Sequence, residues 1–214
     1  MPKIVNKIVK ILITSDFFLN LGWGLLGPIF AIFIVQNIAV ENVSEAAKVA
    51  GFASLSYWAV KSMLQIPIGH YLDRNHGEKD DFWFMITGTF IAGFIPLGYL
   101  ISSQPWHIYT LQIIYAVGMS MVFPSWLAIF SRHIDKGKEA LEWGMESTFL
   151  GAGAGIAGGL GGVIASVFGF NIVFIIVSFF TFFSTLLLLF IKNDISPRDK
   201  DSIRIAPVRP FIEP

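Results

Sequence analysis

The sequence contains no cysteine among its 214 residues. This absence excludes disulfide bonds, thiolate metal sites and cysteine nucleophiles together. The four histidines do not have the spacing of metal ligands, so we expect no metal site. No nucleophile stands beside a base in the pattern that catalysis requires. We therefore expect no enzyme activity, no cofactor and no nucleic-acid partner.

Charged residues are also scarce. They make up 14% of the chain, whereas a soluble domain carries about 25%. Hydrophobic residues reach 54%, with 21 phenylalanines, and the mean hydropathy is +0.66. A soluble core of this length cannot bury so much apolar surface, so the composition indicates a protein embedded in a lipid bilayer. The first apolar run is too long for a signal peptide and lacks a cleavage site, so we expect no cleavable signal.

Six apolar segments reach the length of about 20 residues that spans a bilayer. They lie near 11–36, 45–70, 82–103, 106–131, 140–167 and 171–191, with short polar connections. The pattern predicts an all-α polytopic membrane protein with one six-helix domain over residues 1–192. Residues 193–214 combine four prolines with charges, which is typical of a disordered tail.

Lysine and arginine predict the orientation of these spans. With the N-terminus inside, 13 of the 15 basic residues fall on the inner face, as the positive-inside rule requires. The two exceptions are Lys48, which lies outside, and Lys61, which lies within the membrane. We therefore expect both termini to be cytoplasmic, in a protein of the cytoplasmic (inner) membrane.

Lys61 is the most informative single residue. At 1.5 Å per residue it lies roughly 18 Å from the polar end at Asp73 and about 25 Å from Ser44. Its side chain is too short to reach either surface, and a charge at this depth is costly enough to indicate a function. The alternative is a structural ion pair with Asp16 or Glu146.

Polar and aromatic side chains share helix faces in the first, second and fourth spans. They predict a substrate cavity lined by Asn20, Trp23, Tyr57, Lys61, Gln65, Gln112, Tyr115 and Trp126. Asp16 and Glu146 are candidates for coupling to an ion or proton. The alternatives are solvation of Asp16 near the inner surface, a structural partnership for Glu146, and ordinary packing for the tryptophans.

The fifth span contains a glycine-rich run from Gly151 to Gly162. Small residues four apart allow another helix to approach closely, so we expect a packing surface. Its predicted members are Gly151, Gly155, Gly158 and Gly162. The run is not a nucleotide-binding loop, because no strand precedes it and no Lys-Ser/Thr pair ends it.

The first and fourth spans resemble each other. The segment 21–33 matches 117–130 with one extra residue after the proline, and Pro28 aligns with Pro124. Spans one and four would then begin two three-helix repeats. A repeat with an odd number of spans is inverted relative to its neighbour.

Four motifs resemble those of the major facilitator superfamily, specifically its N-terminal six-helix half. They are Leu21-Gly-Trp-Gly through Pro28, the glycine-rich fifth span, Phe168-Gly-Phe-Asn171, and a loop with Gly69, Asp73, Arg74, Gly77 and Lys79. The resemblance implies that this loop gates the cytoplasmic side. The chain departs from the family pattern by one extra residue after Arg74, and by Glu78, Ile114 and Gly158 at motif positions. These departures argue against drug/proton antiport through the usual groups.

The resemblance also implies a second half. Members of the family have two six-helix halves, and a single half would expose its polar face to lipid. We expect a parallel homodimer, in which Asp73 meets the start of the partner's fifth span near Lys136 and Lys138. A separately encoded partner half and a fragment of a longer protein are the alternatives. The expected function is secondary transport of a sugar, organic anion or drug-like solute by alternating access; the rival is a non-transporting membrane subunit.

Overall fold

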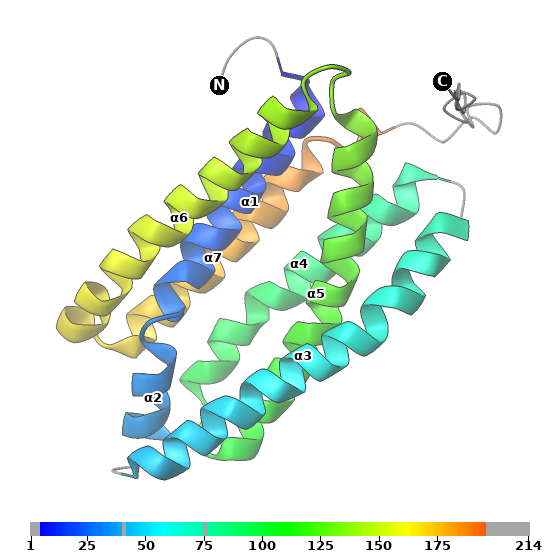
Figure 1. Ribbon diagram of the computed structural model, residues 1–214. Helices are drawn as coiled ribbons and strands as arrows, with labels where there is room; N and C mark the ends of the chain where they lie inside the picture. Colours follow the sequence, from blue (N-terminus) through cyan, green and yellow to red (C-terminus); the bar gives the residue numbers. More distant parts are fainter. Residues whose placement is uncertain (1–4, 40–41, 75–76, 196–214) are drawn as a thin grey trace, which may run out of the picture.

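The computed structural model describes residues 5–39, 42–74 and 77–195, so most of the predicted tail lies outside the described residues. All regular elements in these ranges are helices, and they form one bundle (Figure 1). This confirms the all-α prediction. The seven helices are α1 (Lys7–Leu26), α2 (Phe30–Asn37), α3 (Val43–Arg74), α4 (Glu78–Leu100), α5 (Pro105–His133), α6 (Glu139–Phe168) and α7 (Phe170–Leu189).

Five of these helices are long and apolar enough to cross a membrane. They are α1, α4, α5, α6 and α7. The helix α3 contains the predicted second span and has 32 residues. It is not among the five, because Lys48, Lys61 and Gln65 interrupt its apolar residues. The helix predicted to carry the key lysine is thus also a comparatively polar one.

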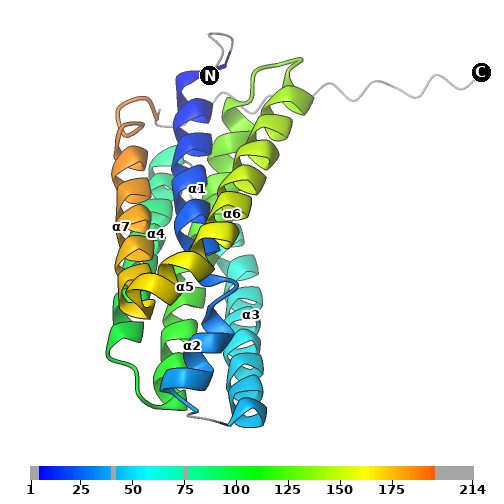
Figure 2. The ribbon, with the colours of Figure 1, turned by 90° about the vertical axis from the view of Figure 1, so that its left-hand side faces the viewer.

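The predicted first span is divided into α1 and α2 at Gly27, Pro28 and Ile29. Proline has no N–H to donate and its ring clashes with the preceding turn, so it breaks or bends a helix. The amide of Ile29 donates to the carbonyl of Leu26 at 3.1 Å, which tightens the break. Figure 2 shows α2 continuing beyond α1 after this break. Pro67, Pro96 and Pro124 remain inside their helices.

Close backbone contacts between small residues hold the bundle together. The helix α1 packs on α6 and α7, while α5 packs on α3 and α4. A Cβ added to Gly88 of α4 would lie 2.3 Å from the carbonyl oxygen of Gly118 on α5. A Cβ added to Gly161 of α6 would lie 2.2 Å from the carbonyl oxygen of Leu25 on α1. Neither position has room for a side chain.

The face of α6 that packs within the chain contains Gly153, Ala157 and Gly161, all of which are buried. The predicted packing residues lie elsewhere on the helix. A Cβ added at Gly151, Gly155, Gly158 or Gly162 would meet nothing within 4 Å. Among the described residues, none of these four glycines is therefore closely packed against another helix, and their packing on another chain stays a prediction.

Candidate functional site

A cavity of about 370 Å³ lies between α1, α5 and α6. Its wall combines carboxylates, an amide and several aromatic rings. The lining residues are Asp16, Leu19, Asn20, Trp23, Tyr115, Met119, Val122, Phe123, Trp126, Leu127, Trp143, Glu146 and Leu150. Six of the ten residues predicted to line a substrate cavity or couple an ion are among them: Asp16, Asn20, Trp23, Tyr115, Trp126 and Glu146. The structure brings these six together, while their role in transport stays a prediction.

The two carboxylates of the cavity come from different helices, Asp16 from α1 and Glu146 from α6. Asn20 lies one turn beyond Asp16 and donates its side-chain N–H to the Asp16 carbonyl at 2.9 Å. Within the described ranges, neither carboxylate forms an ion pair. Two like charges in a medium of low polarity repel each other. Such a pair is suited to binding a cation or holding a proton.

Two separate groups of stacked rings contribute to the cavity wall. Trp23 stacks on Tyr115 with 4.0 Å between ring centroids, and Tyr57 stacks on the same tyrosine at 5.1 Å. Trp126 stacks on Phe130 at 4.6 Å. The indole nitrogens of Trp23 and Trp126 are buried, and no described residue accepts a hydrogen bond from them. Trp23, Tyr115 and Trp126 give the cavity aromatic contacts that suit a ring-bearing solute.

Lys61 lies beside this cavity, behind the ring of Phe123. Its Nζ is 5.0 Å from the ring centroids of Trp58 and Phe123 and 5.6 Å from that of Tyr57. The residue is 9% exposed in the chain. No carboxylate of residues 5–39, 42–74 or 77–195 lies within 4.0 Å of Nζ. The alternative of a structural ion pair with Asp16 or Glu146 is therefore not realised in this structure.

The two predicted glutamines do not line the cavity. Gln112 donates its side-chain N–H to the hydroxyl of Tyr99 at 3.1 Å. Tyr99 is 1% exposed and belongs to the apolar core, so Gln112 satisfies a buried hydroxyl. Gln65 is half-buried on α3, one turn beyond Lys61. Neither glutamine lines this cavity, and their place in a substrate cavity stays a prediction.

The predicted gating loop joins α3 to α4. Gly69, Asp73 and Arg74 lie in the last turns of α3, while Gly77 precedes α4 and Lys79 lies in its first turn. Residues 75–76 lie outside the described residues. The side chains of Asp73, Arg74 and Lys79 are exposed. A gating role for this loop stays a prediction.

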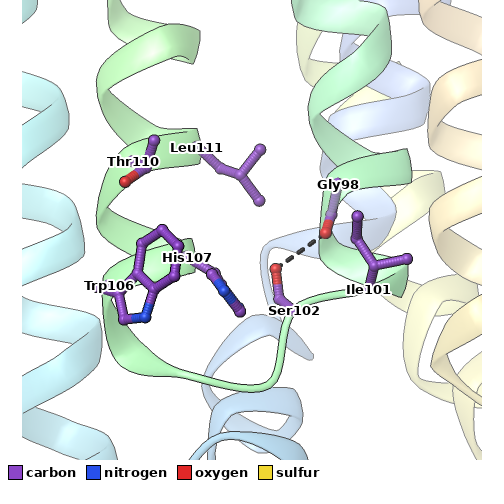
Figure 3. A pocket seen from close by; sticks show the side chains of 7 residues that line it. All are labelled: Gly98, Ile101, Ser102, Trp106, His107, Thr110 and Leu111. Carbon is purple, nitrogen blue, oxygen red and sulfur yellow. Dashed lines mark hydrogen bonds between the residues drawn. The ribbon is translucent and has the colours of Figure 1, made fainter.

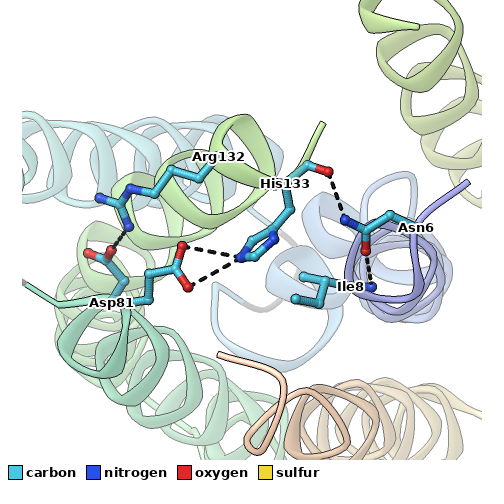
Figure 4. Close-up of polar contacts among 6 residues, drawn as sticks. Asn6, Ile8, Asp81, Arg132 and His133 are labelled. Atoms are coloured by element: carbon cyan, nitrogen blue, oxygen red, sulfur yellow. Dashed lines mark hydrogen bonds and ion pairs between the residues drawn. The ribbon is translucent and has the colours of Figure 1, made fainter. Parts of the chain in front are cut away.

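A polar cluster near this loop was not predicted (Figure 4). Arg132 of α5 pairs with the buried Asp81 of α4. His133 contacts Glu78 at 3.2 Å, and its carbonyl accepts a hydrogen bond from Asn6 at 2.9 Å. The cluster therefore joins α4, α5 and the start of α1 at one end of the bundle. The sequence signal was present, since these residues stand at the ends of predicted spans.

Phe123 and Trp143 are further lining residues that sequence reasoning missed. Trp143 stands three residues before Glu146, so helical periodicity places both on one face. That signal was available. Nothing in the sequence separates Phe123 from the phenylalanines that face outward.

A second cavity, of about 180 Å³, lies where α4 ends and α5 begins (Figure 3). It is lined by Gly98, Ile101, Ser102, Trp106, His107, Thr110 and Leu111. The Ser102 hydroxyl donates to the carbonyl of Gly98 at 2.9 Å, and the Nδ1 of His107 accepts from the amide of Ser103 at 3.1 Å. The Ser102 hydroxyl and the His107 Nδ1 therefore already form hydrogen bonds within the chain. The larger cavity is therefore the candidate site.

A bundle of helices that are mostly long and apolar enough to cross a membrane defines the class of polytopic membrane proteins. Residues 12–213 match the Major Facilitator Superfamily. The chain belongs to this family, whose members are secondary transporters, and it is an integral membrane protein.

Two relatives agree with this assignment, and a solved structure shares the fold. The chain is 30% identical over 190 residues to the multi-drug resistance efflux pump PmrA of Streptococcus pneumoniae, covering 87% of this chain and 45% of the pump. It is 26% identical over 174 residues to the uncharacterized MFS-type transporter MJ1560 of Methanocaldococcus jannaschii, covering 81% and 42%. The chain thus spans less than half the length of these relatives. The crystal structure of the POT family transporter PepTSo superposes with a TM-score of 0.75 at 17% identity, over 94% of this chain and 40% of that one.

Proposed function

We propose that the chain moves a small organic solute across the cytoplasmic membrane by alternating access. The observation that carries this proposal is the cavity of about 370 Å³. It unites two carboxylates, an amide and stacked rings at membrane depth. Intramembrane ionisable groups are expensive and mark solute or ion pathways by default. A cavity of this size and mixed lining is at the lower end of the range for small-molecule sites.

The packing of the helices supports two inverted three-helix repeats. If α1 is exchanged with α5, α3 with α6, and α4 with α7, the main contacts are preserved. The contact of α1 with α6 becomes that of α5 with α3, and the contact of α1 with α7 becomes that of α5 with α4. The contact of α4 with α7 maps onto itself. This grouping treats α1 and α2 as one span and includes α3 as a span, which gives six.

The matching segments of spans one and four fit the same exchange. In the alignment of 21–33 with 117–130, Gly22 corresponds to Gly118. A Cβ added to Gly22 would lie 3.1 Å from Phe180 on α7, and one added to Gly118 would lie 2.8 Å from Gly88 on α4. Because α7 and α4 are equivalent under the exchange, the two glycines make equivalent contacts.

The helices α3 and α6 provide the interface to a second six-helix unit in this proposal. Each has few buried residues for its length: five of 32 in α3 and four of 30 in α6. They lie on opposite sides of the bundle (Figure 1), and they carry Lys61 and Glu146. In a parallel homodimer, α3 of one copy would pack on the glycines of α6 in the other. A separately encoded half, or a second half in a longer chain, would meet the same surface.

Reconstitution tests the function. Purified protein is first screened against metabolites by thermal shift, because a bound solute stabilises the folded state. Uptake of each stabilising solute into proteoliposomes is then measured, with Lys61→Met and the exposed Lys48→Met as the matched pair. Solute-dependent stabilisation with no uptake would identify a non-transporting subunit and contradict the proposal.

Cross-linking tests the dimer and its gate. Asp73→Cys and Gly137→Cys, placed on separate copies, are expected to cross-link between chains, because in the proposed dimer position 73 lies at the positive dipole end of the partner's α6. Ser103→Cys with Gly137→Cys is the control pair, since the two positions belong to opposite ends of the bundle. Cross-links confined to one chain, or a monomer that transports, would contradict the homodimer.

A further inference from the structure

Two carboxylates line the cavity, and an ammonium lies beside it behind one of the lining rings. Asp16 and Glu146 line it from α1 and α6. On the α3 side, the ammonium of Lys61 lies 5.0 Å from the ring centroid of Phe123, and Phe123 itself lines the cavity. The carboxylates and the ammonium are thus separated by the cavity and one ring. They are not paired with each other or with other charges in the part of the chain that the structure describes.

The rings around Lys61 hold it without neutralising it. Trp58, Tyr57 and Phe123 offer their negative faces to the ammonium, which is a weaker interaction than an ion pair in the same environment. The lysine stem has four flexible carbons. Rotation about these bonds would bring Nζ past the edge of Phe123 toward the cavity. A carboxylate at that edge would form a direct ion pair with Lys61.

A solute with one sign of charge matches only one side of the site. A cation placed between Asp16 and Glu146 relieves their repulsion and leaves Lys61 uncompensated. An anion placed near Lys61 faces two carboxylates across a cavity of low polarity, where repulsion is strong. A solute that carries both charges satisfies both sides at once. Trp23 and Tyr115 line the same cavity and would contact an aromatic body bound there.

We propose that the cavity selects aromatic zwitterions, with the solute ammonium at Asp16 and Glu146 and its carboxylate at Lys61. This inference rests on the proposed function and names the chemical class of its solute. It assigns Lys61 to specificity: the residue discriminates a free carboxylate from its ester.

Matched triads of probes test this assignment by titration calorimetry on the purified chain in nanodiscs. One triad is phenylalanine, its methyl ester and its N-acetyl derivative. The other is para-aminomethylbenzoate with the same two derivatives, which holds the charges further apart. The ester removes the negative charge and the N-acetyl group removes the positive one. In at least one triad the zwitterion is expected to bind roughly 10- to 100-fold more tightly than both derivatives. If in neither triad the zwitterion binds more tightly than both its ester and its N-acetyl derivative, the inference is overturned.

Variants assign each charge to its side of the cavity. Lys61→Met should lower zwitterion affinity to that of the ester and leave ester affinity unchanged. Asp16→Asn combined with Glu146→Gln should lower zwitterion affinity to that of the N-acetyl derivative. Lys48→Met and Glu139→Gln replace exposed charges on the same helices α3 and α6 and should preserve the ranking. Equal weakening of all three probes by Lys61→Met, with unchanged melting, would show a structural lysine and overturn the assignment.

Uptake separates this inference from the proposed function. Zwitterion-selective binding without uptake into proteoliposomes contradicts transport and keeps the assignment of the site. Uptake that shows no preference for the zwitterion over its ester contradicts the assignment and keeps transport.

Discussion

The two faces of α6 have almost the same composition and opposite surroundings. On one face Gly153 and Gly161 are buried against Phe17 and Leu25 of α1. On the other face Gly151, Gly155 and Gly162 are exposed. A Cβ added at any of the three would have no described atom of another element within 4 Å. Both faces permit close approach of another helix. Only one of them is used within the chain.

This difference shows what glycine alone determines. A small residue permits a contact, and the partner helix decides whether the contact is made. The partner helix α1 has a small residue at the contact: a Cβ added to Gly24 would lie 2.8 Å from the Cβ of Ala157 on α6. The open face has no such partner in the described chain. Substitutions on α6 measure the difference, and the main ones are given from the largest expected effect on folding to the smallest.

Gly161→Ala should have the largest effect. The added methyl group would lie 2.2 Å from the Leu25 carbonyl oxygen, so α1 and α6 must separate. Forced overpacking of this kind costs about 1 to 3 kcal/mol, and backbone cannot move aside as a side chain can. We expect a loss toward the upper end of that range, measured as the melting temperature and the folded fraction in detergent.

Gly155→Ala is the control for this prediction. It adds the same methyl group to the open face and gains helix propensity of up to about 1 kcal/mol. We expect unchanged or slightly higher stability. Equal destabilisation by both substitutions would contradict the distinction between the two faces.

Glu142 provides a second comparison on the same helix. It is fully buried and accepts a hydrogen bond from the amide of Asp135 at 3.3 Å. Glu142→Ala removes that acceptor and a negative charge from the first turn of the helix, at a cost of about 1 to 2 kcal/mol of folding free energy. Chemical or thermal unfolding in detergent measures this loss.

The matched substitution is Glu139→Ala, in the same turn. Glu139 is exposed and accepts from the amide of Gly137 at 3.1 Å. Water can replace that contact, so we expect a smaller effect. A larger loss at position 139 than at position 142 would show that helix-end charge, and not burial, determines stability here.

Most of the fold could be predicted from the sequence, because apolar length and proline chemistry are local properties. The span near 140–167 corresponds to α6 (Glu139–Phe168), which ends at Gly169 with a positive φ of 81°. The predicted span near 82–103 starts four residues after the beginning of α4, which begins at Glu78. Its first turn carries carboxylates that a hydropathy pattern excludes, although carboxylates are favourable at a helix start. The pairing of Asp81 with Arg132 joins residues 51 positions apart, which no local pattern reveals.

The candidate site could be predicted in part. Asp16, Trp23 and Glu146 stand out because they are polar or aromatic at membrane depth, and the structure brings them into one cavity. Gln112 is likewise a polar residue within a predicted span, but its side chain donates a hydrogen bond to the buried hydroxyl of Tyr99. Helical periodicity gives the face of a residue. Which neighbouring helix packs against that face, at each level along the helix axis, decides what the residue contacts. The packing partner is known only once the bundle has assembled.

Gly155→Leu should have the smallest effect on the folding of the chain and should act on association. The position is exposed, so the larger side chain is accommodated and the melting temperature of the isolated chain should be unchanged. If the open face packs on a second copy, leucine would hold the two helices apart and raise the dissociation constant by about tenfold, equivalent to 1.4 kcal/mol. Gly155→Ala at the same position should raise it less, and Gly162→Leu, two turns along the same face, should reproduce the effect of leucine. Light scattering across a dilution series in detergent measures the equilibrium. Association that does not respond to leucine at either position would remove this face from the interface, and α3 alone would then be the surface to test.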